Sequence, residues 1–132
     1  MAIVLNNARK QLISMLKADL NHRLMVISAR MQRTAAQSQR LSEEKATIQN
    51  AHMQALIEQG TENIELSDIQ NIQYMTADID TELSLLAIKD DDMECEMRMI
   101  ETQLQALNAE EEEIDKTMNN DIKREFGIFS NS

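Results

Sequence analysis

Histidine and carboxylate side chains occur at one spacing that could bind a metal ion. Asp19 and His22 are three positions apart, so a helix would place both on one face, as in half of a di-iron carboxylate site. Such a site needs a second pair of this kind, and the only other histidine is His52. We therefore predict that neither histidine is a metal ligand.

Other residue types that could do chemistry also lack the necessary companions. The acidic clusters at 90–92 and 110–113 have no glycine or spaced oxygen ligands of a calcium loop, and we expect them on solvated helix faces. Cys95 is the only cysteine, which excludes an internal disulfide. No glycine-rich phosphate loop, Ser/His/Asp set or CxxC motif occurs. We predict no catalytic residue, no cofactor, no metal and no enzymatic activity.

The element that dominates the chain is a heptad pattern in its second half. Apolar residues recur there at alternating steps of four and three, which is the spacing of a coiled-coil helix. Only Asp90 and Glu111 interrupt it. Each is expected either to lie at the seam edge and reach solvent or an arginine such as Arg30 or Arg33, or to specify register or pair with an Arg or Lys of a neighbouring subunit. The predicted seam is Ile79, Leu83, Leu86, Asp90, Met93, Met97, Ile100, Leu104, Leu107, Glu111, Ile114 and Met118.

A similar but weaker pattern predicts a first helix over residues 3–59. Three consecutive seam residues there, Leu16, Leu20 and Leu24, are spaced by four, which would locally relax a supercoil. The predicted seam is Ile13, Leu16, Leu20, Leu24, Ile27, Met31, Thr34, Ser38, Leu41, Lys45, Ile48, His52 and Ala55.

Turn signals separate the two helices. Gly60 is a predicted helix C-cap, and Ser67 with Gln70 matches a capping box that would begin the next helix. We therefore predict one elongated domain over residues 1–132, with a turn at 60–67, a second helix at 68–125 and an apolar tail at 126–132.

Charge predicts how the helices pair. Residues 1–60 carry eight basic and four acidic groups, a net charge of +4, whereas residues 61–132 carry five basic and nineteen acidic groups, a net charge of -14. Opposite charges meet if the helices fold back on each other, so we predict an all-α fold, a long antiparallel two-helix coiled-coil hairpin. The total of -10 argues against nucleic acid as a partner.

Some apolar residues exceed what one hairpin can bury. The run at 24–27 is apolar on more than one side, several second-helix residues lie off the seam, and the tail either folds back near residues 3–5 or docks on another subunit. We expect hairpins to pack into a larger helical assembly whose partners are copies of the same chain. The candidate self-assembly residues are Leu24, Met25, Ile27, Leu85, Ile88, Met99, Phe126, Ile128 and Phe129.

The N-terminal segment MAIVLNNARKQLISMLKADLN resembles the start of bacterial flagellins, with the likeness carried by Ile3, Val4, Leu5, Asn6, Leu12, Leu16 and Leu20. Flagellins and the needle subunits of type III secretion systems are helical-hairpin proteins that polymerise. The resemblance implies a filament or tube, an extracellular location and a secretion apparatus as partner. The sequence has no cleaved-signal pattern and no run long enough to span a membrane.

Two other functions fit a hairpin without a catalytic site. One is a cytoplasmic coiled-coil adaptor or spacer, and the other is a holdase-type chaperone subunit similar to prefoldin. Prefoldin subunits have β-hairpins at the mid-chain bend, whereas residues 60–70 contain no pair of alternating strands. Self-assembly is therefore the preferred hypothesis, with these two as alternatives.

Overall fold

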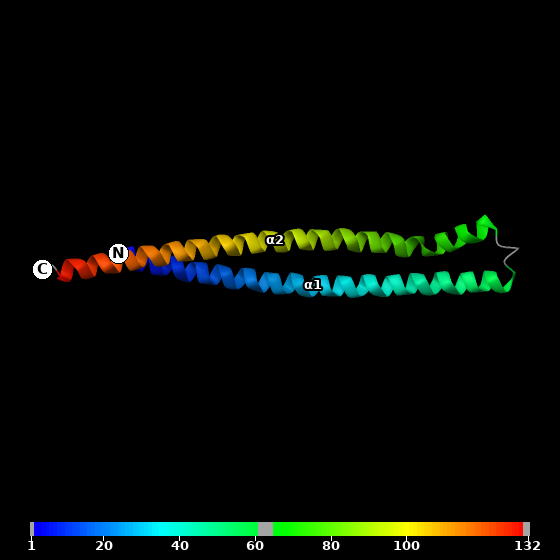
Figure 1. The fold of residues 1–132 in the computed structure, drawn as a ribbon, viewed down its shortest axis with the longest axis horizontal. Coiled ribbons are helices and arrows are strands. Elements are labelled where there is room, and N and C mark those ends of the chain that lie inside the picture. The colour runs from blue at the N-terminus through cyan, green and yellow to red at the C-terminus, as the bar shows by residue number, and fades with distance from the viewer. Residues whose placement is uncertain (1, 61–64, 131–132) are drawn as a thin grey trace. The chain divides into compact units, whose positions relative to one another are not determined.

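The computed structural model describes residues 2–60 and 65–130, and the side chains of residues 3–60 and 65–127. The described residues form two helices and no strand: α1 spans Ala2–Glu58 and α2 spans Leu66–Ser130 (Figure 1). Neither helix contains proline, and most of their residues have good helix propensity. The predicted all-α helical hairpin is confirmed.

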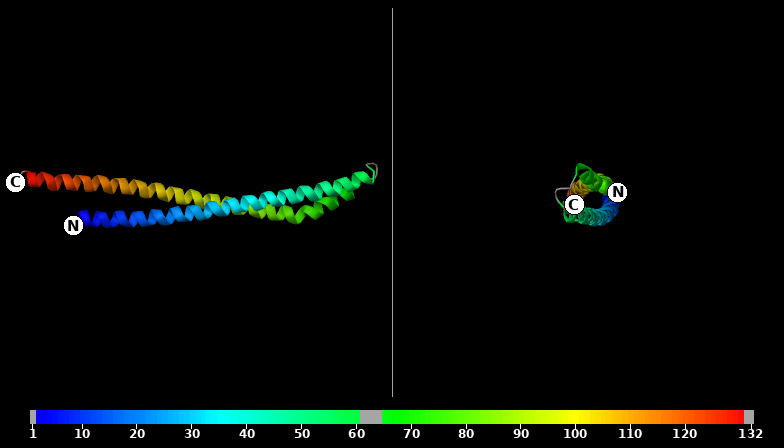
Figure 2. Two further views of the ribbon diagram at one scale, coloured as in Figure 1. Left: turned by 90° about the horizontal axis from the view of Figure 1, so that it is seen from below. Right: turned by 90° about the vertical axis from the view of Figure 1, so that its right-hand side faces the viewer.

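Contacts divide the chain into two units, each with one stretch of each helix. The terminal unit comprises Met1–Ile27 and Cys95–Ser132, and the turn unit comprises Ser28–Glu94. In each unit the α1 stretch lies alongside an α2 stretch of opposite direction (Figure 2).

Ion pairs between α1 and α2 show the antiparallel register inside each unit. In the terminal unit, Lys10 Nζ lies 2.6 Å from Asp115 Oδ1. In the turn unit, Lys45 Nζ lies 2.5 Å from Asp80 Oδ1. These pairs join basic residues of α1 to acidic residues of α2, as the division of charge predicted.

The α2 seam follows the predicted heptad spacing. Its apolar members bury their side chains, and the polar Thr76 is buried because its hydroxyl donates to the backbone carbonyls of Ile72 and Gln73, at 3.2 and 3.3 Å. Every predicted seam position from Ile79 to Met118 is buried or half-buried, Asp90 and Glu111 included. The observed series is Ile72, Thr76, Ile79, Leu83, Leu86, Asp90, Met93, Met97, Ile100, Leu104, Leu107, Glu111, Ile114, Met118 and Asp121.

The α1 seam differs from the prediction at two points. Leu16 is exposed and Lys17 occupies the seam, so the steps alternate regularly and the predicted run of fours is wrong. The aliphatic stem of Lys17 covers apolar surface while its ammonium reaches Glu111. A seam predicted from apolar residues alone does not include a lysine in this role. Near the turn, Leu56 rather than Ala55 is half-buried. The observed series is Asn6, Lys10, Ile13, Lys17, Leu20, Leu24, Ile27, Met31, Thr34, Ser38, Leu41, Lys45, Ile48 and His52.

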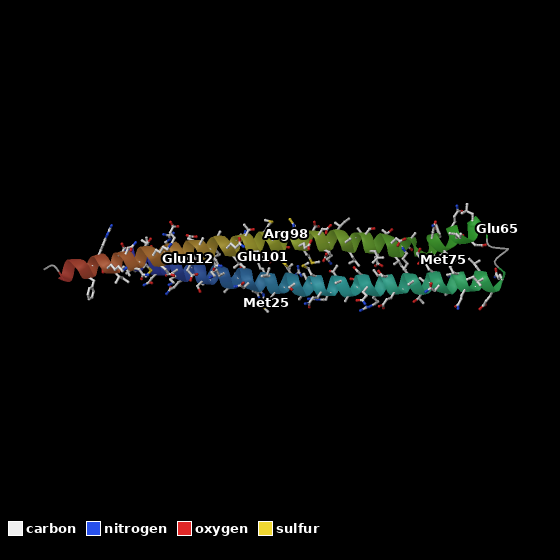
Figure 3. The ribbon with its side chains drawn as sticks, viewed as in Figure 1. Met25, Glu65, Met75, Arg98, Glu101 and Glu112 are labelled. Atoms are coloured by element: carbon white, nitrogen blue, oxygen red, sulfur yellow. The ribbon has the colours of Figure 1, made fainter. Side chains whose placement is uncertain are left out.

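Both helix ends at the turn are capped, one of them differently from the prediction. Gly60 has a φ of 104°, and its N–H donates to the Ile57 carbonyl at 3.0 Å, which confirms the predicted C-cap. The predicted capping box at Ser67 is wrong, because α2 already begins at Leu66. Instead, the Asp68 carboxylate accepts from the Glu65 N–H at 3.1 Å, and Glu65 lies immediately before α2 (Figure 3). Turn residues 61–64 lie outside the described residues.

The C-terminal segment is also helical. Residues 126–130, predicted as a separate tail, continue α2, and Gly127 does not interrupt it. A single glycine costs a helix only about 1 kcal/mol, too little to end one this long. The segment therefore does not fold back on residues 3–5, and residues 131–132 lie outside the described part of the chain.

Candidate functional site

The side chains that could bind a metal ion are apart from one another. His22 is exposed, and Asp19 pairs instead with Arg23, whose Nε lies 3.3 Å from Asp19 Oδ2. His52 is half-buried on the α1 seam in the turn unit. Among the residues whose positions the structure describes, no three His, Cys, Asp or Glu side chains form a group that could hold a metal ion.

The seam carries two acidic positions with different surroundings. Glu111 accepts a hydrogen bond from Lys17 at 3.1 Å. Asp90 lies beside Thr34 and Ser38 at a groove of about 410 Å³ in the turn unit. The arginines considered as its partners, Arg30 and Arg33, are exposed, and no ion pair joins either to Asp90 within the described side chains.

The predicted self-assembly residues fall into three groups. Ile27 is only 4% exposed and Leu24 is half-buried, so the chain's own packing covers Ile27 and part of Leu24. Met25 projects from α1 away from α2 and is 72% exposed (Figure 3). The side chains of Ile128 and Phe129 lie outside the described residues. The candidates with exposed side chains are therefore Met25, Leu85, Ile88, Met99 and Phe126.

On α2 several exposed, mostly apolar residues form a second row away from the seam. In the terminal unit this row, which we call the outer stripe of α2, repeats at alternating steps of four and three, as the seam does. All of its members are exposed, with Met99 the largest. In the turn unit, Leu85 and Ile88 occupy the equivalent heptad positions and are also exposed. The outer stripe of α2 comprises Cys95, Met99, Thr102, Ala106 and Ala109.

α1 carries a corresponding row in the terminal unit. This outer stripe of α1 consists of Leu5, Ala8, Leu12 and Met15, all exposed and all placed away from the seam. In a two-stranded coiled coil these positions face water and are usually polar. Leu85, Ile88 and Met99 were predicted as self-assembly residues, whereas the outer stripe of α1 was not predicted. The signal for it is that off-seam apolar residues of α1 also repeat at heptad spacing.

A shallow depression lies on the outer stripe of α2. Its volume is about 360 Å³, and it is lined by Cys95, Arg98, Met99, Thr102 and Gln103. A separate groove of about 410 Å³ runs between the helices of the terminal unit, with Leu16, Leu20, Arg23, Ala106 and Glu110 among its lining residues. Both hollows are open to solvent and are lined largely by apolar atoms, which suits helix packing better than binding of a small polar ligand.

Comparisons of the chain with protein-family models, with curated proteins and with solved structures find no significant match. Among the helices described, none is long and apolar enough to cross a membrane. The outer stripes are the candidate functional surface because they are exposed, mostly apolar rows at heptad spacing.

Proposed function

We propose that this chain is a non-enzymatic structural subunit that self-assembles into a filament or tube through the outer faces of its paired helices. The observation that carries the proposal is the outer stripe of α2, an exposed and mostly apolar row that has the spacing of a coiled-coil seam but lies away from the seam.

Burial energetics support self-assembly. Met99 is 59% exposed at a heptad position of the terminal unit, and in the turn unit Leu85 and Ile88 are 61% and 59% exposed at heptad positions. Covering apolar surface contributes about 25 cal/mol per Å², so a row of partly exposed side chains favours association once another helix covers all of it. Single exposed apolar residues are ordinary, but a repeating row of them is typical of an interface.

The C-terminal end of α2 offers a further contact. α2 has 65 residues and α1 has 57, and α2 continues past the N-terminal end of α1 in the terminal unit (Figure 1). Phe126 in this extension is 76% exposed, and Ile122 one turn before it is also exposed. We propose that this end docks on another subunit.

The proposed location is extracellular, with a secretion apparatus as a second partner. The support is the flagellin-like N-terminal segment, in which Leu5, Leu12 and Leu16 are exposed and therefore accessible to another protein. A cytoplasmic location is the alternative, and it fits a coiled-coil spacer.

Electron microscopy and analytical ultracentrifugation of the purified chain test self-assembly. Regular fibres and a concentration-dependent rise in mass are expected. Met99→Glu should keep the helical circular dichroism but abolish the fibres, because it places a charge in the outer stripe of α2. Glu101→Gln, on the same helix but outside the stripe, is the matched control and should assemble like the natural chain. A monodisperse monomer at high concentration would contradict self-assembly and favour the spacer.

A further inference from the structure

The two outer stripes of the terminal unit differ in side-chain size. The α1 stripe is bulky, with Leu5, Leu12 and Met15 more than half exposed. The α2 stripe is made mostly of small side chains, with Met99 as its only large member. A bulky row fits against a small row more closely than either row fits against itself.

The depression on α2 has the form of a coiled-coil hole. Four of its lining residues, Cys95, Arg98, Met99 and Thr102, are spaced as i, i+3, i+4 and i+7 on one helix. In coiled coils this set of four receives one apolar side chain from the facing helix. The hole is on the outer face, so α1 of the same hairpin does not fill it.

Charge separates the two stripes further. Within the terminal unit, residues 2–27 of α1 hold four basic and one acidic side chain, a net charge of +3. Residues 95–130 of α2 hold four basic and nine acidic side chains, a net charge of -5. The heptad positions bordering the α1 stripe include Arg9 and Arg23, which pair within the chain with Glu110 and Asp19. Those bordering the α2 stripe include Glu96 and Glu112.

From size, hole geometry and charge together we infer that the lateral contact joins unlike surfaces: the outer stripe of α2 in one copy packs on the outer stripe of α1 in the next copy. This inference rests on the proposed self-assembly and specifies its interface. A contact between two different patches does not close on itself unless the rotation completes a ring, so it produces an open stack of subunits. Leu12 or Met15 of one copy would then enter the hole around Cys95 of its neighbour.

The competing arrangement is a symmetric dimer through two α2 stripes. It would place the net charges of -5 and -5 of the two α2 stretches against each other. It would also face small side chains with small side chains and leave the bulky α1 stripe exposed. The unlike contact avoids all three costs.

Cys95, the only cysteine and a member of the hole, provides a built-in probe. The natural chain, with its Cys95, is mixed with an affinity-tagged variant in which Cys95→Ser removes that cysteine. The tagged variant carries one new cysteine on the outer side of α1, by Ala8→Cys, Met15→Cys or His22→Cys. A short thiol-reactive crosslinker then joins cysteines that lie close together in neighbouring copies. At one or more of these positions we expect a tagged-untagged dimer several-fold more abundant than with the control Ser14→Cys, which lies on another side of α1. Natural chain alone should give little crosslinked dimer.

Crosslinking of Cys95 to Cys95 in the natural chain would overturn the inference, as would equal yields from all α1 positions or no mixed dimer at any of them. Electron microscopy of the same samples separates the two proposals. Fibres accompanied by Cys95 to Cys95 crosslinks would leave self-assembly standing with a symmetric interface. An absence of any assembly would overturn both proposals.

Discussion

Lys17 Nζ lies 3.1 Å from Glu111 Oε2, and both residues occupy seam positions whose heptad neighbours are mostly apolar. Their side chains are 28% and 31% exposed, so water screens the pair only in part. A charged pair inside a seam adds little stability, but it penalises every register in which either charge would face an apolar residue. We expect the pair to select the alignment of α1 with α2 more than to strengthen it.

A double-mutant cycle tests this role. Lys17→Leu and Glu111→Leu each leave one charge facing an apolar side chain, whereas the double variant replaces the pair by an apolar contact. The coupling energy from urea unfolding should be about 0.2 to 1 kcal/mol, and the double variant should be at least as stable as the natural chain. A double variant less stable than both single variants would show that the ion pair itself stabilises the hairpin.

Burial separates the seam from the outer face. Ile100 is 4% exposed and Ile88 is 59% exposed, although both are isoleucines of α2. Ile100→Ala should lower the free energy of unfolding by about 2 to 4 kcal/mol because it leaves a cavity in the seam. Ile88→Ala, the matched control, should change it by less than about 0.5 kcal/mol. Chemical denaturation at low protein concentration, where assembly is suppressed, measures the free energy of unfolding of both variants. Equal losses of free energy in the two variants would contradict the placement of Ile100 in the seam and Ile88 on the outer face.

The start of α2 distinguishes the predicted cap from the observed one. Asp68→Ala removes the carboxylate that accepts from the Glu65 N–H and should cost about 0.5 to 1 kcal/mol in thermal unfolding. Ser67→Ala should change stability by only a few tenths of a kcal/mol, since its hydroxyl reaches only the Glu65 side chain, at 3.5 Å. The reverse order of the two losses would restore the capping box predicted at Ser67.

The ion pair of Lys10 should make the stability of the hairpin depend on pH in the alkaline range. The hydrogen bond to Asp115 chiefly raises the pKa of Lys10, with the charges of Asp115 and Glu111 adding to the shift and desolvation opposing it. Because the folded-state pKa is raised, the stabilisation is fully present below the ordinary lysine pKa of about 10.4 and is lost as pH rises through the folded-state value.

Melting temperatures of the natural chain and of Lys10→Met, compared from neutral to alkaline pH, measure this contribution. The difference in melting temperature between the natural chain and Lys10→Met should become smaller above the ordinary lysine pKa. When both chains also carry Asp115→Asn, most of this difference in melting temperature should be absent at every pH. A difference that stays constant through the alkaline range would contradict the assigned role of the Lys10 ammonium.

Sequence periodicity was sufficient where the seam is apolar. From Ile79 to Met118 the α2 seam agrees with the prediction at every position, because burying a row of apolar side chains requires the heptad spacing. The prediction failed at Leu16, where the neighbouring Lys17 takes the seam to reach a carboxylate on the other helix. It also failed at residues 126–130, which were predicted as a separate apolar tail but continue α2 through Gly127.

Two long helices, their antiparallel pairing and the position of the Gly60 cap could be predicted from the sequence, because heptad spacing, charge division and the steric freedom of glycine can be read directly from the order of residues. Whether Leu16 or Lys17 fills the seam, how α2 begins and which apolar residues remain exposed became clear from the folded chain. The seam position of Lys17 and the division into covered and exposed faces depend on contacts between residues about one hundred positions apart, such as Arg9 with Glu110, which a one-dimensional pattern does not contain. The start of α2 depends instead on a local contact, in which the Asp68 carboxylate reaches the Glu65 N–H.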